Sequence, residues 1–194
     1  MQENHYLVPL HQEGSRKDLE QNIVADSIED AEYWFVDAKD RLLDVNSWNK
    51  YCPAISAEFR LTDIHGLGVG RHARKGDLIR MDIPGPGATR LGGFEWVCIE
   101  AIEYDDYPDL SMETFAIRVR TAQNPLNNKD GHNNSPDNDA TCTFVIERRG
   151  TKLFATYHSR NGSGNVTDTT TNQWLGLQDT EWSCLIKGLL GNAQ

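Results

Sequence analysis

Two neighbouring polar residues near the end of the chain have the types that nucleophilic catalysis uses. His158 is followed directly by Ser159, and a histidine base beside a serine hydroxyl is the pair that acyl transfer needs. Both residues fall in a stretch with the alternation of a β-strand, where consecutive side chains point to opposite faces. The spacing therefore argues against a hydrogen-bonded Ser–His pair and leaves His158 alone as an acid–base candidate.

Four acidic residues cluster near the end of an earlier strand-like stretch. Glu100 and Glu103 lie close to its end, and Asp105 and Asp106 follow. Two of these carboxyl groups could act as a proton donor and acceptor, although we favour a solvated acidic turn. The six histidines are scattered without His-x-His or His-x-x-x-His spacing. We therefore expect no metal, no cofactor and no catalytic constellation.

Long polar side chains on three strand-like stretches could anchor an acidic ligand, since an arginine in a pocket binds a carboxylate through two hydrogen bonds. Arg118 and Arg120 share one strand face, as do His158 and Arg160. We favour a solvent-facing ladder of opposite charges instead, because the apolar side chains that alternate with the two arginines indicate that the other face is buried. The residues of this set are Arg118, Arg120, Glu147, His158 and Arg160.

A glycine-rich stretch, HGLGVGRHARKGD, contains Gly66, Gly68 and Gly70 followed by Arg71. A nucleotide-binding fingerprint has a strand before its glycines and a helix after them. Here a strand-like stretch follows, so we expect a flexible hairpin rather than a phosphate loop. The sequence PGPG at 84–87 is typical of a turn, and both segments could gate a pocket.

The elements that position these residues begin with a short strand at 21–26 and a helix over 27–46. Ser27 is the expected helix N-cap, with Asp30 at the capping-box position. Apolar residues then recur at alternating steps of three and four, which places them on one helix face. These residues are Ile28, Ala31, Phe35, Ala38, Leu42 and Val45.

Six further strands are expected from alternating apolar residues, and a tight hairpin at 149–151 joins the last two. They span 55–61, 78–83, 94–102, 114–120, 140–148 and 152–159. Polar loops are expected at 124–139 and 161–173. A short helix of about eleven residues, begun by Asp179 or Thr180 and ended by Gly191, closes the chain. Hairpin-linked strands form an antiparallel sheet, whose concave face can bury the apolar side of a helix.

Composition narrows the classes of partner. The chain has 194 residues, 38% of them hydrophobic, and a formal net charge of −10, which argues against nucleic acid and anionic membrane surfaces. No apolar run reaches the about 20 residues of a membrane helix, and the first residues do not resemble a signal peptide. We therefore expect a cytoplasmic protein with reduced thiols. The four cysteines form no Cys-x-x-Cys pair, which argues against a zinc site. They are Cys52, Cys98, Cys142 and Cys184.

Two sequence segments and the order of elements over 21–190 resemble one known superfamily. SIEDAEYW at 27–34 is similar to its helix start after the first strand, and VNSWNKYCP at 45–53 is similar to its Trp-centred turn before the second strand. The family is the START-related, polyketide-cyclase-like (SRPBCC) superfamily. The resemblance implies an α+β helix-grip fold, with a curved antiparallel sheet of about six to seven strands around the C-terminal helix. We expect a loose arm at 1–20 and a single domain over 21–194.

Members of this superfamily commonly hold an apolar cavity between the sheet and the last helix. The resemblance therefore implies binding or carriage of a small hydrophobic molecule, lipid-like or polyketide-like. The alternative for each apolar residue is that it simply fills a close-packed core. The expected cavity-lining residues are Phe59, Met81, Trp96, Phe115, Ile117, Phe144, Tyr157, Trp182 and Ile186.

Two other functions stay open at this point, and the sequence leaves the oligomeric state undefined. One is a cyclase, aromatase or hydrolase-like enzyme that uses the same cavity, with His158 or Glu100 as its acid–base group. It requires one of these side chains to point into the pocket with a perturbed pKa. The other is a protein-interaction module without a small ligand, which exposed tryptophans near the PGPG and glycine-rich loops would indicate.

Overall fold

The strands of the computed structural model form one antiparallel sheet. The structure describes residues 7–83, 94–127, 140–162 and 177–191. Within them, seven strands follow one another across the sheet in the order β1-β7-β6-β5-β4-β3-β2, so β1 and β2 are its edges. Their bounds are β1 Ser15–Val24, β2 Glu58–Thr62, β3 Leu78–Asp82, β4 Glu95–Tyr107, β5 Met112–Thr121, β6 Thr141–Arg149 and β7 Lys152–Gly162.

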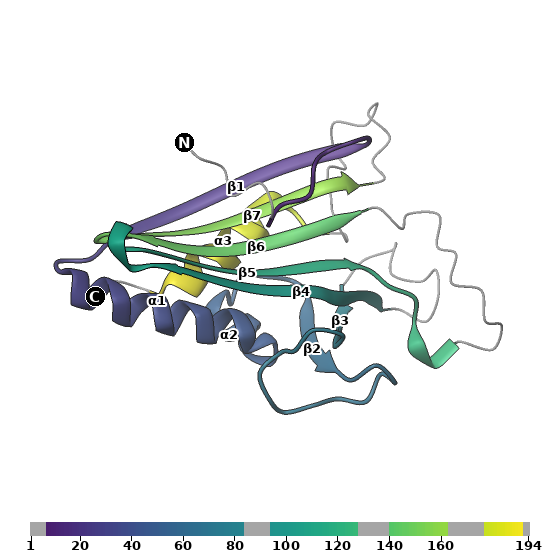
Figure 1. Cartoon of the computed structure of the whole chain (residues 1–194). Helices are drawn as coiled ribbons and strands as arrows, with labels where there is room; N and C mark the ends of the chain where they lie inside the picture. Colours follow the sequence, from purple (N-terminus) through teal and green to yellow (C-terminus); the bar gives the residue numbers. More distant parts are fainter. Residues whose placement is uncertain (1–6, 84–93, 128–139, 163–176, 192–194) are drawn as a thin grey trace.

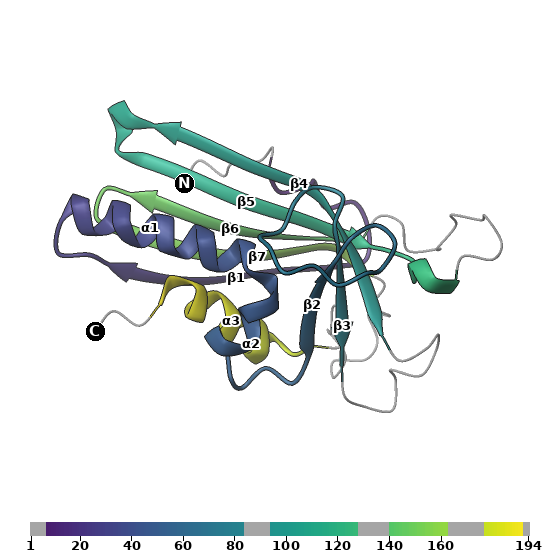
Figure 2. The same cartoon turned by 90° about the horizontal axis from the view of Figure 1, so that it is seen from below.

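Helices cover one face of this sheet. Figures 1 and 2 show α1 and α3 lying on the same side, with the short α2 beside α3. The sheet curves around α3, so the helix-grip fold implied by the sequence is confirmed. The helical segments are α1 Ile28–Leu43, η1 Val45–Ser47, α2 Trp48–Tyr51, η2 Pro108–Leu110, η3 Pro125–Asn127 and α3 Asp179–Leu190.

The boundaries of the first strand and helix differ partly from the prediction. The Ser27 side chain accepts a hydrogen bond from the Asp30 amide at 3.0 Å, as its N-cap position predicts. The helix ends at Leu43, and a 3-10 turn and α2 complete the stretch. The first strand begins at Ser15, within the predicted loose arm, because it pairs along its whole length with β7. The sequence of residues 15–20 is mostly polar and did not indicate a strand. Backbone hydrogen bonds to β7 stabilise it at the edge of the sheet.

Apolar side chains from α1, α3 and the concave sheet face form one core. The strands alternate as expected: on β5, Phe115, Ile117 and Val119 belong to the core, while Arg118 between them faces the other side. The helices contribute Phe35, Leu42, Trp182 and Ile186, among others. Side-chain alternation thus gives the sheet an apolar concave face and a polar convex face.

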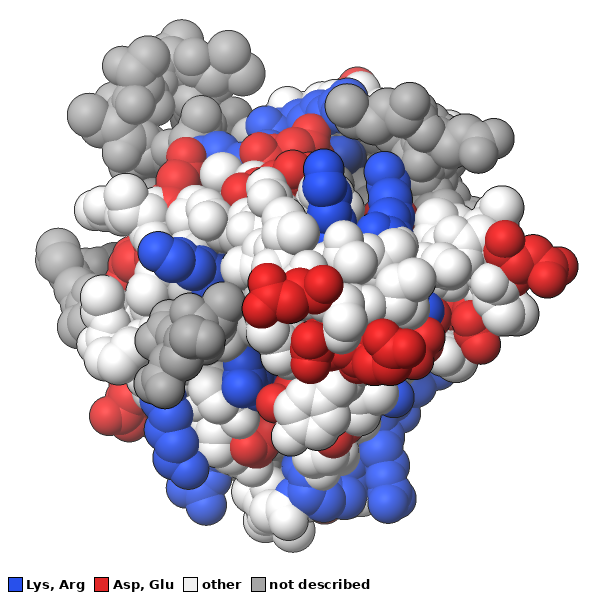
Figure 3. All heavy atoms as spheres, turned by 90° about the vertical axis from the view of Figure 1, so that its left-hand side faces the viewer, with Lys and Arg blue, Asp and Glu red and all other residues white. Residues whose placement is uncertain are grey.

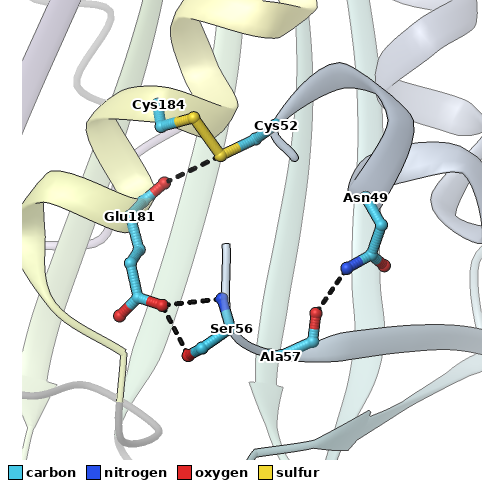
Figure 4. Close-up of a disulfide and its surroundings, with 6 residues drawn as sticks. All are labelled: Asn49, Cys52, Ser56, Ala57, Glu181 and Cys184. Atoms are coloured by element: carbon cyan, nitrogen blue, oxygen red, sulfur yellow. Dashed lines mark hydrogen bonds between the residues drawn. A yellow bond between two sulfur atoms is a disulfide. The ribbon is translucent and has the colours of Figure 1, made fainter. Parts of the chain in front are cut away.

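Three contacts hold α3 in place near its start. A disulfide joins Cys52, directly after α2, to Cys184 on α3 (Figure 4). The Glu181 carboxylate accepts hydrogen bonds from the Ser56 amide at 2.8 Å and the Ser56 hydroxyl at 2.5 Å. Its other oxygen accepts from the Gln178 amide at 2.8 Å. The first turn of α3 is therefore tied to the segment between α2 and β2.

The expectation of reduced thiols is wrong for two of the four cysteines. Cys52 and Cys184 are 132 residues apart in the sequence, and nothing in their spacing indicates a pair. The other two, Cys98 and Cys142, are free, and Cys142 is buried as its apolar strand predicted. The disulfide depends on the fold, which brings α2 and α3 together.

Several predicted turns lie outside the described residues. These are the PGPG segment at 84–87, residues 128–139 of the first polar loop, and residues 163–173 of the second.

Removing the disulfide should lower stability, because a cross-link that closes a long loop restricts the unfolded chain. We expect the double variant Cys52→Ala/Cys184→Ala to lose about 2–4 kcal/mol of unfolding free energy, measured by urea unfolding without reductant. Cys98→Ala, which removes a free and half-buried thiol, is the matched control. Unfolding of the wild type that is unaffected by reductant would contradict the pairing.

Candidate functional site

The structure buries all nine predicted cavity-lining residues, with relative exposures between 0 and 6%. Eight of them belong to the core between the sheet and the helices: Phe59, Met81, Phe115, Ile117, Phe144, Tyr157, Trp182 and Ile186. Burial alone is compatible with both core packing and ligand contact.

Trp96 does not lie with the other eight. It precedes Val97 on β4, and Val97 belongs to the concave core, so Trp96 points to the opposite face. Its ring lies against the glycine-rich stretch, 3.4 Å from where a Cβ of Gly66 would be. The sequence supports either register of the strand, and the aromatic character of Trp96 favoured the wrong one.

Five aromatic rings lie in contact beneath α3. Tyr157 of β7 stacks on Trp182 of α3, with ring centroids 4.9 Å apart and planes 19° apart. The ring centroid of Phe144 on β6 lies 5.4 Å from that of Tyr157 and 5.7 Å from that of Trp182. Phe59 and Trp48 extend the cluster toward β2 and α2. Trp48 was not among the predicted site residues, although it is the tryptophan of the turn that carried the family resemblance.

The ring cluster meets the surface at a small recess between β1, β7 and the start of α3. Its volume is about 10 Å³, and its walls include Tyr157, Ser159 and Trp182. Lys17 and Asp179, which form an ion pair, line it as well. The recess thus has a polar rim and an aromatic floor, and it is far smaller than the about 300–1,000 Å³ of an ordinary small-molecule pocket.

Tyr157 lines this recess. Its hydroxyl is buried and has no hydrogen-bond partner of standard geometry among the described residues, although the Cys142 thiol and Ser159 lie near it. Burial raises the pKa of Tyr157 well above its ordinary value, and the nearby Cys142 thiol raises it further, while Ser159 opposes the shift. The group is therefore a neutral hydroxyl, which can donate or accept a hydrogen bond inside an apolar site.

The predicted polar set lies on the convex face, away from the ring cluster. His158 Nδ1 is 2.6 Å from Asp18 Oδ1, and its Nε2 is 2.9 Å from Thr156 Oγ1. Arg160 Nη2 is also 2.6 Å from Asp18 Oδ1. Burial lowers the pKa of His158, and the hydrogen bond that its Nδ1 donates to the Asp18 carboxylate only partly opposes the shift.

The two arginines of β5 form a similar network. Arg118 and Arg120 both bind the Glu100 carboxylate at 2.9 Å, and Arg118 also donates to the Leu7 carbonyl at 3.3 Å. On β6, Glu147 pairs with Arg149. The Glu100 contacts agree with the favoured interpretation, a ladder of opposite charges across strands, whereas Glu147 and Arg149 pair within one strand.

The sequence offered His158 or Glu100 as the acid–base group of an enzyme, and their position in the structure argues against both roles. His158 and Glu100 both lie on the convex face, where His158 is hydrogen-bonded to Asp18 and Glu100 is paired with Arg118 and Arg120. Neither side chain reaches the ring cluster, so the enzyme hypothesis loses both of its candidate groups. The tryptophans of the described chain also give no exposed cluster, since Trp48, Trp96 and Trp182 are buried and Trp34 is half-buried.

The surface outside this network carries both acidic and basic side chains. On the end of the molecule that carries the start of α1 and the β4–β5 turn, acidic and basic side chains are interspersed (Figure 3). Within the described residues, no group of three or more His, Cys, Asp or Glu side chains is placed to hold a metal ion. None of the described helices is both long enough and apolar enough to span a bilayer.

Comparison with known proteins found similar chains among solved structures, at low sequence identity. No protein-family model matches the chain, and no curated protein matches it in sequence. A hypothetical protein from Helicobacter pylori is 12% identical, with a TM-score of 0.48 over 90% of this chain and 86% of its own. Norcoclaurine synthase from Thalictrum flavum, solved with a transition-state analogue, is 10% identical, with a TM-score of 0.44. The match covers 91% of this chain and 94% of the synthase chain.

A major latex-like protein from Panax ginseng is also similar, at 12% identity and a TM-score of 0.39 over 91% of this chain and 93% of that one. Similarity at this level concerns the fold alone. The fold and the ring cluster define an α+β helix-grip protein with an aromatic interior and a charged outer face.

The Asp18 network generates a prediction about pH. Burial favours the neutral form of Asp18, but hydrogen bonds from His158, Arg16 and Arg160 outweigh it and lower the pKa of Asp18 to about 2. The folded state then binds fewer protons than the unfolded state below the ordinary carboxyl pKa, so this stabilisation is present at neutral pH and is lost as the pH falls toward 2.

We expect Asp18→Asn to lower the unfolding free energy at pH 7 by about 1 kcal/mol, since Asp18 is partly exposed and solvent screens its pairs. Urea unfolding at several pH values should show the difference from wild type shrinking between about pH 4 and pH 2. Asp26→Asn, at a carboxylate just after β1, is the control. A difference that stays constant with pH would contradict the network.

Proposed function

We propose that the protein binds a small, largely apolar molecule between the sheet and α3, as a carrier or sensor. The observation that carries this proposal is the Tyr157 hydroxyl, which is buried among aromatic rings and lacks a hydrogen-bond partner in the described chain. An unsatisfied buried hydroxyl costs about 1–3 kcal/mol. A ligand atom that hydrogen bonds to it would recover this free energy.

The surroundings of the hydroxyl define the kind of ligand. The rings of Phe144, Tyr157 and Trp182 offer flat apolar surfaces, which favour an aromatic or otherwise planar body. The one internal polar anchor favours a single hydroxyl, carbonyl or ether oxygen on that body. This description fits a polyketide-like ligand better than a simple alkyl chain, and both stay predictions.

Access to the site requires side-chain movement. The recess holds about one water molecule, and the stacked Tyr157 and Trp182 rings fill the space behind it. Because the disulfide at Cys184 fixes α3 two residues beyond Trp182, we expect the Trp182 ring to turn rather than the helix to leave. Breaking the Lys17–Asp179 ion pair would widen the rim.

A pair of matched ligands tests the proposal. We expect wild-type protein to bind 1-naphthol and 1-methylnaphthalene, measured by displacement of the neutral fluorescent probe N-phenyl-1-naphthylamine. Tyr157→Phe should weaken binding of 1-naphthol by about tenfold and leave 1-methylnaphthalene unchanged, because only the naphthol can hydrogen bond to the hydroxyl. The variant should unfold at the wild-type urea concentration or a higher one, because it removes a buried hydroxyl that has no hydrogen-bond partner among the described residues.

Tyr107→Phe removes the hydroxyl of a tyrosine that is 39% exposed, and serves as the control with wild-type affinities. Folded wild-type protein that binds none of these compounds would contradict the proposal. Equal affinity of Tyr157→Phe and wild type for 1-naphthol would remove Tyr157 as the anchor.

The cellular location stays a prediction. We expected a cytoplasmic protein, whereas a disulfide favours an oxidising compartment. Alkylation of free thiols in lysates of the native host, read by mass spectrometry at Cys52 and Cys184, would decide between them. Unmodified Cys52 and Cys184 would indicate the disulfide and contradict a reducing location.

A further inference from the structure

A groove of about 470 Å³ lies along β2, β3 and the glycine-rich stretch. It shares no lining residue with the recess beside Tyr157. Four charged residues line it: Glu58 and Arg60 of β2, and Arg80 and Asp82 of β3. They alternate with apolar residues that face the core, so all four point to the convex side of the sheet.

The register of these two strands brings like charges together. Arg60 lies directly opposite Arg80, and Glu58 lies directly opposite Asp82. Side chains in such pairs have Cβ atoms about 5 Å apart, and like charges there destabilise a sheet. The buried Phe59 fixes the register on the other face, so the strands cannot shift to relieve the repulsion.

Neither arginine of the groove is neutralised by a carboxylate of the described chain, although Glu58 and Asp82 are the next residues on the same face. Among the described arginines, those that form ion pairs with Asp or Glu are Arg16, Arg41, Arg71, Arg118, Arg120, Arg148, Arg149 and Arg160. Among the described arginines, only Arg60, Arg80 and the exposed Arg74 have no such ion pair, and Arg60 and Arg80 are the two that lie opposite each other.

Neighbouring groups support each guanidinium on one side. The Arg60 guanidinium lies against Gly68, where a Cβ would come within 2.6 Å of its Nε. Gly68 thus provides space for the flat group. The Arg80 guanidinium lies 4.3 Å from the centroid of the Phe94 ring, a cation–π contact that leaves its edge donors available. Both groups are held while their N–H donors stay accessible from the groove.

We propose that Arg60 and Arg80 form a binding site for the carboxylate or phosphate group of a small molecule. Two guanidinium groups can each donate hydrogen bonds to the oxygens of one anion, and such charge-assisted bonds are stronger than neutral ones. The bound anion also removes the repulsion between the two arginines. This site is independent of the proposed apolar ligand site.

The acidic pair beside the arginines defines the rest of the ligand. Glu58 and Asp82 lie two residues along each strand from the arginines, which is about 7 Å. They repel a second anionic group and attract a cationic one. The groove therefore fits a zwitterion whose amine lies about 7 Å from its acidic group, and it disfavours polyanions.

The arginine side-chain signals of the ¹⁵N-labelled full chain test this site directly. Three compounds serve as probes: inorganic phosphate, hexanoate and 6-aminohexanoate, whose amine and carboxylate span a similar distance. We expect saturable shifts of the Arg60 and Arg80 Nε–Hε signals with each, and severalfold tighter binding of 6-aminohexanoate than of hexanoate. Equal affinity for these two would overturn the role of Glu58 and Asp82, and no saturable shift with any probe would overturn the site.

Variants separate binding from a structural role. Arg60→Gln and Arg80→Gln should each weaken phosphate binding by about tenfold or more, while Arg74→Gln, at an exposed arginine outside the groove, should not. Without added anion, both groove variants should melt at or above the wild-type temperature, because the repulsion is relieved. A lower melting temperature together with unchanged phosphate affinity would show that the pair is structural and overturn the proposal.

Discussion

The apolar face of α3 must be covered, and the rest of the structure depends on how the sheet covers it. A helix of twelve residues has little stability alone in water. Its Trp182, Leu185, Ile186 and Leu189 are almost fully buried, so packing against the sheet and α1 supplies most of its stability. The disulfide and the Glu181 hydrogen bonds then fix the position of its first turns. This contact places the Trp182 ring on Tyr157 and creates the aromatic interior.

Strand alternation assigns different chemistry to the two faces of the sheet. The concave face is mainly apolar, and the buried Tyr157 hydroxyl lies on it near the buried Ser159. The convex face is charged, and most of its side chains are bound to one another, as in the network of Asp18, His158 and Arg160. The pair of Arg60 and Arg80 lies on this face without a carboxylate partner among the described residues. We therefore propose an apolar ligand on the concave side of the sheet and an anionic group on its convex side.

The sequence predicted most of the elements and less of the site. Ser27, the alternation around Arg118 and the hairpin at Gly150 are local signals, and each was interpreted correctly. The strand from Ser15 was missed because its residues are polar and its stability comes from pairing with β7. The Cys52–Cys184 pair and the Arg60–Arg80 pair depend on contacts between distant segments. The face of Trp96 depends on strand register, which alternation leaves undefined when both faces carry apolar residues.

The central claim is that the ring cluster beneath α3 opens to admit an apolar ligand at Tyr157. The most direct measurement is the set of nuclear Overhauser effects between 1-naphthol and the ring protons of the wild-type protein. We expect contacts from the bound naphthol to the rings of Tyr157, Trp182 and Phe144. Contacts limited to exposed rings such as Tyr33 or Tyr104, with none to this cluster, would contradict it.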